Sequence, residues 1–244
     1  SIVCKKILVS GNSWLISLII LISLNFLNAQ SQSLYPNIGT EIMFQPEWAK
    51  KLYYDRIELF KQDTLKFNQI VFLGNSITEG GKDWNEKFGV VGISNRGISG
   101  DSTDGVIARL NEIIHFSPKA IFLLIGINDI YNELTPSTNY VANNILKIIK
   151  LINQELPETK IFLQTILPVE KEVYKDKIIA VNEMIKTFVS QSKFEIIDLY
   201  SIFVNEEGKM KKELSYDGVH LNDKGYSVWV NHIKPTVLNL ANHN

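Results

Sequence analysis

The segment "VFLGNSITEGG" (residues 71–81) is an apolar run that ends at Gly74 and is followed by hydroxyl and amide side chains. Short apolar runs rich in β-branched residues favour strands that are buried on both faces of a sheet. Ser76 therefore stands on a tight turn directly after a predicted strand. Serine and asparagine are also the preferred caps of helices, so this segment alone is better explained as a helix start than as a reactive serine.

Runs of the same kind recur along the chain, with helical patterns between them. The predicted strands are "QIVFLG" (69–74), "VVGISN" (90–95), "AIFLLIG" (120–126), "KIFLQTI" (160–166) and "KFEIIDL" (193–199). Apolar residues recur at helical spacing over 46–64, 102–116, 138–156, 175–192 and about 223–240. Strands that alternate with helices favour a parallel sheet with helices on both faces. The pattern predicts an α/β protein with three layers, α/β/α, and five parallel strands.

Length and composition set bounds on the domain and its partners. The 244 residues, 45% of them hydrophobic, suffice for one domain with a substantial core, and no repeat or low-complexity linker divides them. The formal net charge of -1 gives no electrostatic basis for binding nucleic acid or an acidic membrane surface. Partners must therefore be inferred from a site, and the oligomeric state stays open.

The N-terminus has the pattern of a secretory signal. Lys5 and Lys6 precede an apolar run over residues 14–27, and the small Ala29 follows. The run is shorter than the about 20 apolar residues that span a membrane, which favours cleavage after Ala29 over an uncleaved anchor. We therefore predict a signal over 1–29, a loose leader over 30–46 and a single domain over 47–244. The mature protein would be exported, periplasmic or extracellular, without stable membrane association.

Two glycine-containing segments follow later predicted strands. In "SNRGISGDST" (94–103), Gly97 and Gly100 would let the backbone turn sharply and direct an N–H group inward. In "LIGINDIY" (124–131), Asn128 offers an amide donor where a strand ends. Each segment alone is explained as an ordinary connection, because glycines and Asn-Asp pairs are common in turns.

A fourth polar cluster, "SYDGVHLNDKGY" (215–226), precedes the last predicted helix. The spacing of Asp217 and His220 lets one turn present a carboxylate to one imidazole nitrogen while the other nitrogen faces outward. Such a pair is often only a surface hydrogen bond. No zinc-binding spacing of His or Cys is present, and the only cysteine, Cys4, lies within the predicted signal. We therefore expect no metal.

Taken together, the four clusters supply the parts of one reaction. Attack on an ester needs a serine, a base that takes its proton and an acid group that holds the base. It also needs N–H donors where negative charge develops on the carbonyl oxygen. Each part is present once, and each follows a predicted strand, where the reactive groups of parallel sheets gather.

The order of these blocks, G-x-S, a glycine after the second strand, G-x-N-D and D-x-x-H, resembles the SGNH hydrolases, or GDSL esterase/lipase family. The likeness spans residues 69–240. "NRGISGDSTDGVIARL" with "GINDI" is similar to the branch that contains platelet-activating-factor acetylhydrolases of the α-subunit type and bacterial carbohydrate acetylesterases. The resemblance implies a flavodoxin-like parallel sheet, and we expect no cofactor.

The resemblance also assigns roles to residues. It implies Ser76 as nucleophile and His220 as base, supported by Asp217. It further implies an oxyanion hole made by the N–H groups of Gly97 and Ser76 and by the Asn128 amide. This sequence departs from the family at Asn75, where an aspartate is usual. Asparagine keeps an acceptor that can brace the turn but loses the charge.

The predicted reaction is hydrolysis of short-chain esters, O-acetyl groups above all, on small molecules or glycans. Asn75 and Trp84 are candidate substrate contacts, although packing in the core is the better explanation for a large aromatic residue such as Trp84. A lysophospholipase or thioesterase is the alternative within hydrolases. A flavodoxin-like module that holds a nucleotide or flavin on "GNSIT" is the alternative outside them, but it gives no reason for Asp217 and His220 to stand together.

Overall fold

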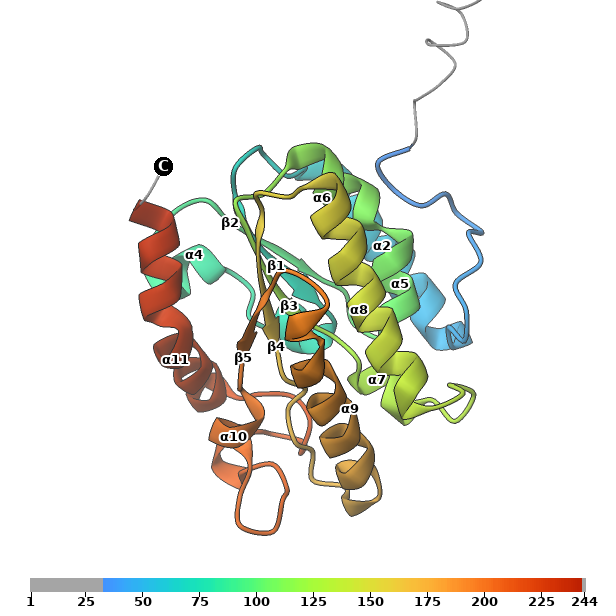
Figure 1. The fold of residues 1–244 in the computed structure, drawn as a ribbon, viewed down its shortest axis with the longest axis vertical. Helices are drawn as coiled ribbons and strands as arrows, with labels where there is room; N and C mark the ends of the chain where they lie inside the picture. Colours follow the sequence, from blue (N-terminus) through green and yellow to red (C-terminus); the bar gives the residue numbers. More distant parts are fainter. Residues whose placement is uncertain (1–32, 243–244) are drawn as a thin grey trace, which may run out of the picture. The chain divides into compact units, whose positions relative to one another are not determined.

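The computed structural model describes residues 33–242 and contains one five-stranded sheet (Figure 1). Its strands are β1 (Ile70–Gly74), β2 (Ile93–Gly97), β3 (Ala120–Leu124), β4 (Lys160–Gln164) and β5 (Glu195–Ile197). All neighbouring strands are parallel, and their order is β2-β1-β3-β4-β5. The predicted five-stranded parallel sheet is therefore confirmed.

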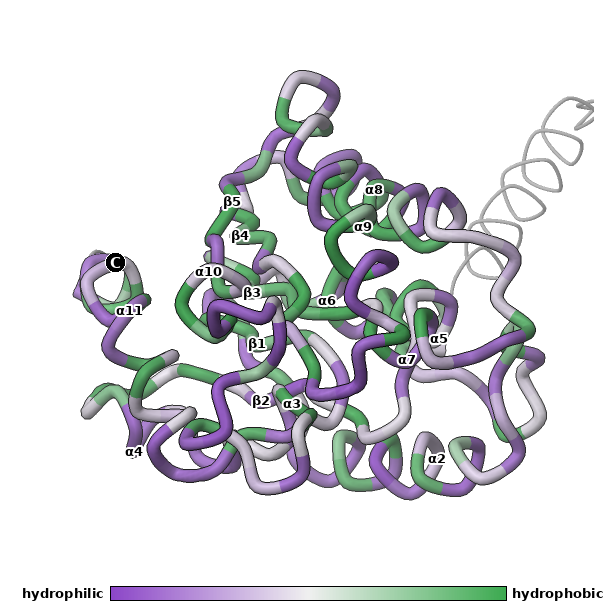
Figure 2. The backbone as a smooth tube through the Cα atoms, turned by 90° about the horizontal axis from the view of Figure 1, so that it is seen from below, coloured by the Kyte–Doolittle hydropathy of each residue, from purple (hydrophilic) through white to green (hydrophobic). Residues whose placement is uncertain are grey.

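Helices cover both faces of this sheet. They are α2 (Glu47–Gln62), α3 (Ser76–Glu79), α4 (Trp84–Phe88), α5 (Thr103–Ala108), α6 (Leu110–Phe116), α7 (Ile127–Tyr131), α8 (Thr138–Glu155), α9 (Lys175–Thr187), α10 (Tyr200–Phe203) and α11 (Asp223–Asn242). The described residues also form the short 3₁₀ helices η1 (Glu172–Tyr174), η2 (Phe188–Ser190) and η3 (Lys212–Leu214). Helices α4 and α11 lie on one face, and α5, α6, α8 and α9 lie on the other (Figures 1 and 2). The three-layer prediction is confirmed.

The register of the strands decides where the connecting loops meet. Gly74, the last residue of β1, pairs with Gly97 of β2 and with Leu124 of β3. Because parallel strands that end in register release their loops at one edge, the segments after β1, β2 and β3 emerge side by side. This edge is where a site built from those loops must lie.

The centre of the core is a stack of aromatic rings across the sheet. Phe72 of β1 stacks on Phe122 of β3, and Phe122 stacks on Phe162 of β4, with ring centroids 4.9 and 4.7 Å apart. Trp84 continues the stack on Phe72 at 4.3 Å and is only 1% exposed. The Trp84 Nε1–H donates to the Thr78 carbonyl at 3.2 Å. Trp84 is therefore a core residue, and its prediction as a substrate contact is wrong.

The described part of the predicted leader is packed rather than loose. Tyr35 and Ile42 are buried in a second apolar cluster with Tyr53 and Ile57 of α2. The Tyr35 hydroxyl also donates to Glu112 at 3.0 Å. The predicted signal, its cleavage after Ala29 and Cys4 lie outside the described residues, so export stays a prediction. Within residues 33–242, no helix is both long and apolar enough to cross a bilayer.

Candidate active site

The serine turn after β1 is held by its neighbours. Asn75 caps α3, and its Oδ1 accepts a hydrogen bond from the Ile77 N–H at 3.0 Å. Gly74 must lack a side chain, because a Cβ there would collide with the Leu124 carbonyl oxygen of β3. Asn75 thus braces the turn as expected, but it is buried, so its prediction as a substrate contact is wrong. Ser76 begins α3 on a rigid support.

Ser76, His220 and Asp217 form a continuous chain of hydrogen bonds. The Ser76 Oγ lies 2.9 Å from the His220 Nε2, although 144 residues separate the two. The His220 Nδ1 lies 2.7 Å from the Asp217 Oδ2, and Asp217 Oδ1 accepts from the Val219 and His220 backbone N–H groups. Partial burial opposes the charge of Asp217, but these hydrogen bonds outweigh it and lower the pKa of the carboxyl. The three side chains are arranged as in a serine hydrolase triad.

The loop after β2 corrects one prediction. The Gly97 N–H donates to the Asn95 Oδ1 at 2.9 Å, so it is not available to an oxyanion. Gly100, three residues later, lines the same cleft as Ser76 and Asn128 and has a φ of 79°. No residue of the described chain accepts a hydrogen bond from the Gly100 N–H. Gly100, and not Gly97, is therefore the glycine of this loop that fits an oxyanion donor.

Gly97 has a packing role instead. A Cβ at this position would collide with the backbone nitrogen of Glu79, the last residue of α3, and with the carbonyl oxygen of Asn75, which caps the start of α3. Backbone atoms cannot swing aside as a flexible side chain would. Gly97 therefore lets the serine turn and the loop after β2 pack against each other.

We predict that Gly97→Ala lowers the free energy of unfolding by about 1–3 kcal/mol or more, because overpacking a rigid site displaces backbone. Urea unfolding followed by circular dichroism measures the change. Alanine keeps its N–H group, so a role of Gly97 as donor alone would predict unchanged stability. A wild-type unfolding midpoint for Gly97→Ala would contradict the packing role.

Asn128, at the start of α7, comes to the same cleft as predicted. Its Nδ2 donates to the Asp101 carbonyl at 2.8 Å, which leaves one amide hydrogen for another acceptor. The adjacent Asp129 is buried and accepts from the Thr103 N–H at 3.1 Å and the Thr103 hydroxyl at 2.5 Å. Burial raises the pKa of Asp129 to about 7. Asp129 thus ties α7 to the start of α5.

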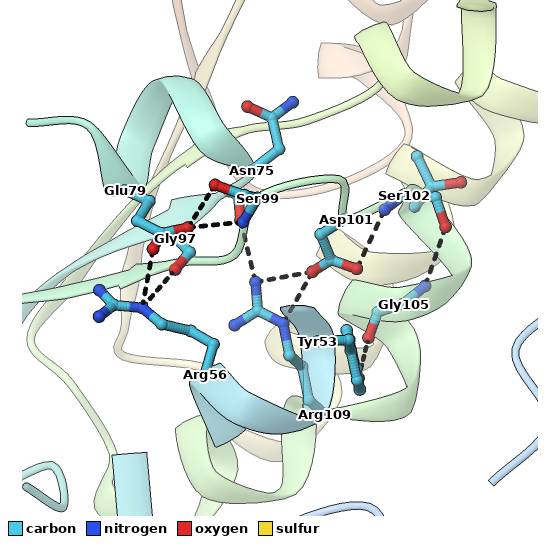
Figure 3. Close-up of polar contacts among 12 residues, drawn as sticks. Tyr53, Arg56, Asn75, Glu79, Gly97, Ser99, Asp101, Ser102, Gly105 and Arg109 are labelled. Carbon is cyan, nitrogen blue, oxygen red and sulfur yellow. Dashed lines mark hydrogen bonds and ion pairs between the residues drawn. The ribbon is translucent and has the colours of Figure 1, made fainter. Parts of the chain in front are cut away.

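A buried ion pair lies beneath the serine turn (Figure 3). Arg109 pairs with Asp101 at 2.9 Å, and its Nη2 also donates to the Gly74 carbonyl at 3.0 Å. Burial raises the pKa of Asp101 to about 6, and Arg109 opposes this rise. The helix predicted over 102–116 is in fact two helices, α5 and α6, which break at Arg109. This arginine therefore joins the end of β1 to the loop after β2.

The cleft has a volume of about 1080 Å³ and an apolar rim that sequence analysis missed. Trp48, Leu134 and Tyr216 line it and are 62%, 72% and 71% exposed. The Tyr216 ring lies almost parallel to the His220 ring, at 15° and 5.9 Å between centroids. Because Tyr216 directly precedes Asp217 in the sequence, its place beside the cleft could have been predicted. Nothing near Trp48 in the sequence points to the cleft.

Among residues 33–242, no three His, Cys, Asp or Glu side chains gather closely enough to hold a metal ion. The protein groups that meet at the cleft are instead a hydroxyl, an imidazole, a carboxylate and amide donors. This set can carry out acyl transfer through a nucleophilic serine.

Comparisons with known proteins agree with this chemistry. The sequence model of the GDSL-like Lipase/Acylhydrolase family matches residues 72–228. The chain is 27% identical over 200 residues to platelet-activating factor acetylhydrolase IB subunit alpha2 of Rattus norvegicus. This alignment covers 79% of the chain and 84% of the relative. A solved GDSL-like lipase from Bacteroides thetaiotaomicron has a TM-score of 0.68 and 25% identity, over 76% of this chain and 97% of that one.

A carbohydrate esterase family 3 structure from Talaromyces cellulolyticus, with a TM-score of 0.56 and 20% identity over 72% of this chain and 98% of that one, supports the fold alone. The family match spans the serine turn, both glycine-containing loops and the Asp217–His220 segment. A non-catalytic binding module is therefore set aside. The chain belongs to the GDSL-like lipase/acylhydrolase family and is a carboxylic ester hydrolase.

Proposed function

We propose that the chain hydrolyses short-chain esters, with O-acetyl groups on carbohydrates as the preferred substrates, through an acyl-enzyme on Ser76. The single observation that carries this proposal is the chain of hydrogen bonds from Ser76 Oγ through His220 to Asp217, at 2.9 and 2.7 Å. Such an arrangement raises the nucleophilicity of a serine that would otherwise keep its proton.

The reaction has two steps. Ser76 Oγ attacks the ester carbonyl carbon while His220 Nε2 takes the hydroxyl proton, and Asp217 stabilises the resulting imidazolium. The tetrahedral intermediate collapses, and His220 returns the proton to the leaving alcohol. Water then attacks the acyl-enzyme with His220 again as base, which releases the carboxylic acid and restores Ser76.

Three donors are assigned to the oxyanion. They are the N–H groups of Ser76 and Gly100 and the second amide hydrogen of Asn128. Gly100 replaces Gly97 in this role because the Gly97 N–H already donates to Asn95. Preorganised donors of this kind are typically worth about 10²–10³ each in rate.

The rim of the cleft supports a carbohydrate as the leaving group. In the first step, the leaving oxygen takes its proton from His220, so the alcohol must lie beside this residue. The exposed ring of Tyr216 is parallel to His220 on that side and offers an apolar surface to the C–H face of a sugar. Trp48 supplies a second exposed ring at the same cleft.

We predict that Tyr216→Ala lowers kcat/KM for glucose pentaacetate about 2- to 10-fold, as expected for the loss of one aromatic contact. The fall should be greater than that for ethyl acetate, whose alcohol has no ring. Tyr216→Phe is the matched control and should behave like the wild type. Equal falls for both esters would show that Tyr216 acts on His220 rather than on the sugar.

The preference for acyl chain length is tested by measuring kcat/KM of the wild-type enzyme with p-nitrophenyl acetate, butyrate and octanoate. A short-chain esterase should give the highest kcat/KM with acetate and the lowest with octanoate. The reverse order would favour the lipid-directed alternative, a lysophospholipase or thioesterase, and would overturn the proposed acyl specificity.

A further inference from the structure

Glu79 connects α3, the helix that begins with Ser76, to the loop that carries Gly100. It lies on α3, one helical turn after Ser76, and its side chain crosses to Ser99 (Figure 3). Glu79 Oε2 accepts from the Ser99 N–H at 2.6 Å and from the Ser99 hydroxyl at 2.7 Å. A single carboxylate oxygen therefore holds both donors of Ser99.

Ser99 is the residue whose carbonyl carbon is bonded to the Gly100 nitrogen. The Asp101 N–H donates to the Ile98 carbonyl at 3.1 Å, and Gly100 has a φ of 79°, as in the third position of a type II turn. Glycine adopts many backbone conformations at little cost, so this turn does not fix itself. The bonds to Glu79 hold Ser99 in place, and they therefore also hold the peptide group that joins Ser99 to the Gly100 nitrogen.

Arg56 of α2 supports the carboxylate from the other side. Its Nε donates to the Gly97 carbonyl at 3.1 Å and lies 3.6 Å from Glu79 Oε1. The guanidinium thus offsets a negative charge that would oppose the developing oxyanion nearby. The family match begins at residue 72, so Arg56 belongs to a segment before the matched residues.

We propose that Glu79, supported by Arg56, is a positioning residue that sets the distance between Ser76 and the Gly100 N–H. Because Ser76 and Glu79 share one turn of α3, the nucleophile and the oxyanion donor move as a unit. The inference rests on the proposed function, since it assigns Gly100 to the oxyanion. It predicts that Glu79 affects the transition state and not the binding of the ester.

The experiment compares Glu79→Ala, Glu79→Gln and Glu79→Asp in the full chain, with p-nitrophenyl acetate as substrate. We expect Glu79→Ala to lower kcat about 10- to 100-fold with KM within twofold of wild type, because a misplaced donor acts only on the transition state. Fluorophosphonate labelling of Ser76 should slow in parallel, because the phosphoryl oxygen occupies the oxyanion site.

The other two variants separate reach from charge. Glutamine keeps an acceptor at the same distance and should recover most of kcat, whereas aspartate keeps the charge but is one methylene short and should resemble alanine. In a double-mutant cycle, adding Ser99→Ala to Glu79→Ala should cost less than Ser99→Ala alone, since Glu79→Ala has already broken the bond to the Ser99 hydroxyl. Glu58→Ala, an exposed carboxylate on α2 that pairs with Lys61, is the control and should leave kcat unchanged.

Three results would overturn the proposal. A lowered melting temperature with unchanged kcat would make Glu79 purely structural. A change in KM alone would make Glu79 a substrate contact. Aspartate matching wild type while glutamine fails would make its charge, not its reach, decisive. Failure of the proposed function itself would be distinct, because the wild-type enzyme would then neither hydrolyse the ester nor label at Ser76.

Discussion

Ser76→Ala is expected to lower kcat for p-nitrophenyl acetate by about 10⁵- to 10⁶-fold, since no acyl-enzyme can form without the hydroxyl. The fold should be retained, because within residues 33–242 the Ser76 side chain makes one hydrogen bond only, to His220. Initial rates and a thermal melt of the same preparation measure both expectations. A variant that hydrolysed the ester at the wild-type rate would contradict the proposed mechanism.

The same variant identifies the site of covalent chemistry. A fluorophosphonate should add its mass to the peptide that contains Ser76 in the wild type and to no peptide in Ser76→Ala. Ser227→Ala is a matched control, because its hydroxyl lies on the exposed surface of α11 and donates to the Asp223 carbonyl. This control should label and turn over like the wild type.

Much of the fold could be predicted because its strands are buried on both faces. All residues of β1 and β3 are buried, so each strand is a continuous apolar run that stands out from the amphipathic helices. The apolar run over 90–95 predicts a strand that begins three residues before β2 and ends two residues before its end. Val91 looks like a strand residue but is 88% exposed, and Gly92 turns the chain with a φ of 89°. Apolar character alone did not distinguish this turn from a strand.

The meeting of Ser76 with His220 could also be predicted, because it depends on topology. Parallel strands release their loops at one edge, so four loops with suitable side chains had to come together there. The choice between Gly97 and Gly100 depends on a finer feature. The Asn95 side chain accepts the hydrogen bond from the Gly97 N–H. The spacing of residues in the sequence does not reveal which donor a single amide side chain will bind.

Residues that support the site were missed for a related reason. In the sequence, Glu79 looks like an ordinary acidic residue of a helix, and Arg56 looks like one charge on an amphipathic helix. Their roles follow from bonds to Ser99 and to the Gly97 carbonyl, which exist only once α2, α3 and the loop after β2 are packed. Exposure of Trp48 and Tyr216 at the cleft is likewise a product of packing.

His220→Gly should lower kcat by about 10⁴- to 10⁶-fold, because Ser76 then has no base and the leaving alcohol has no acid. The glycine keeps the backbone N–H that donates to Asp217, so the turn should persist. Free imidazole should restore a measurable part of the activity, because the His220 side chain is 34% exposed and its removal opens a space beside Asp217.

The restored rate should rise with imidazole concentration and with pH, since only neutral imidazole can accept the Ser76 proton. Asp217 should orient the added ring through the same oxygen that meets the His220 Nδ1 at 2.7 Å. In His220→Gly/Asp217→Ala, the restored rate should therefore fall further. A His220→Gly enzyme that keeps a tenth of the wild-type kcat without imidazole would show that another group takes the proton, and His220 would lose its place in the mechanism.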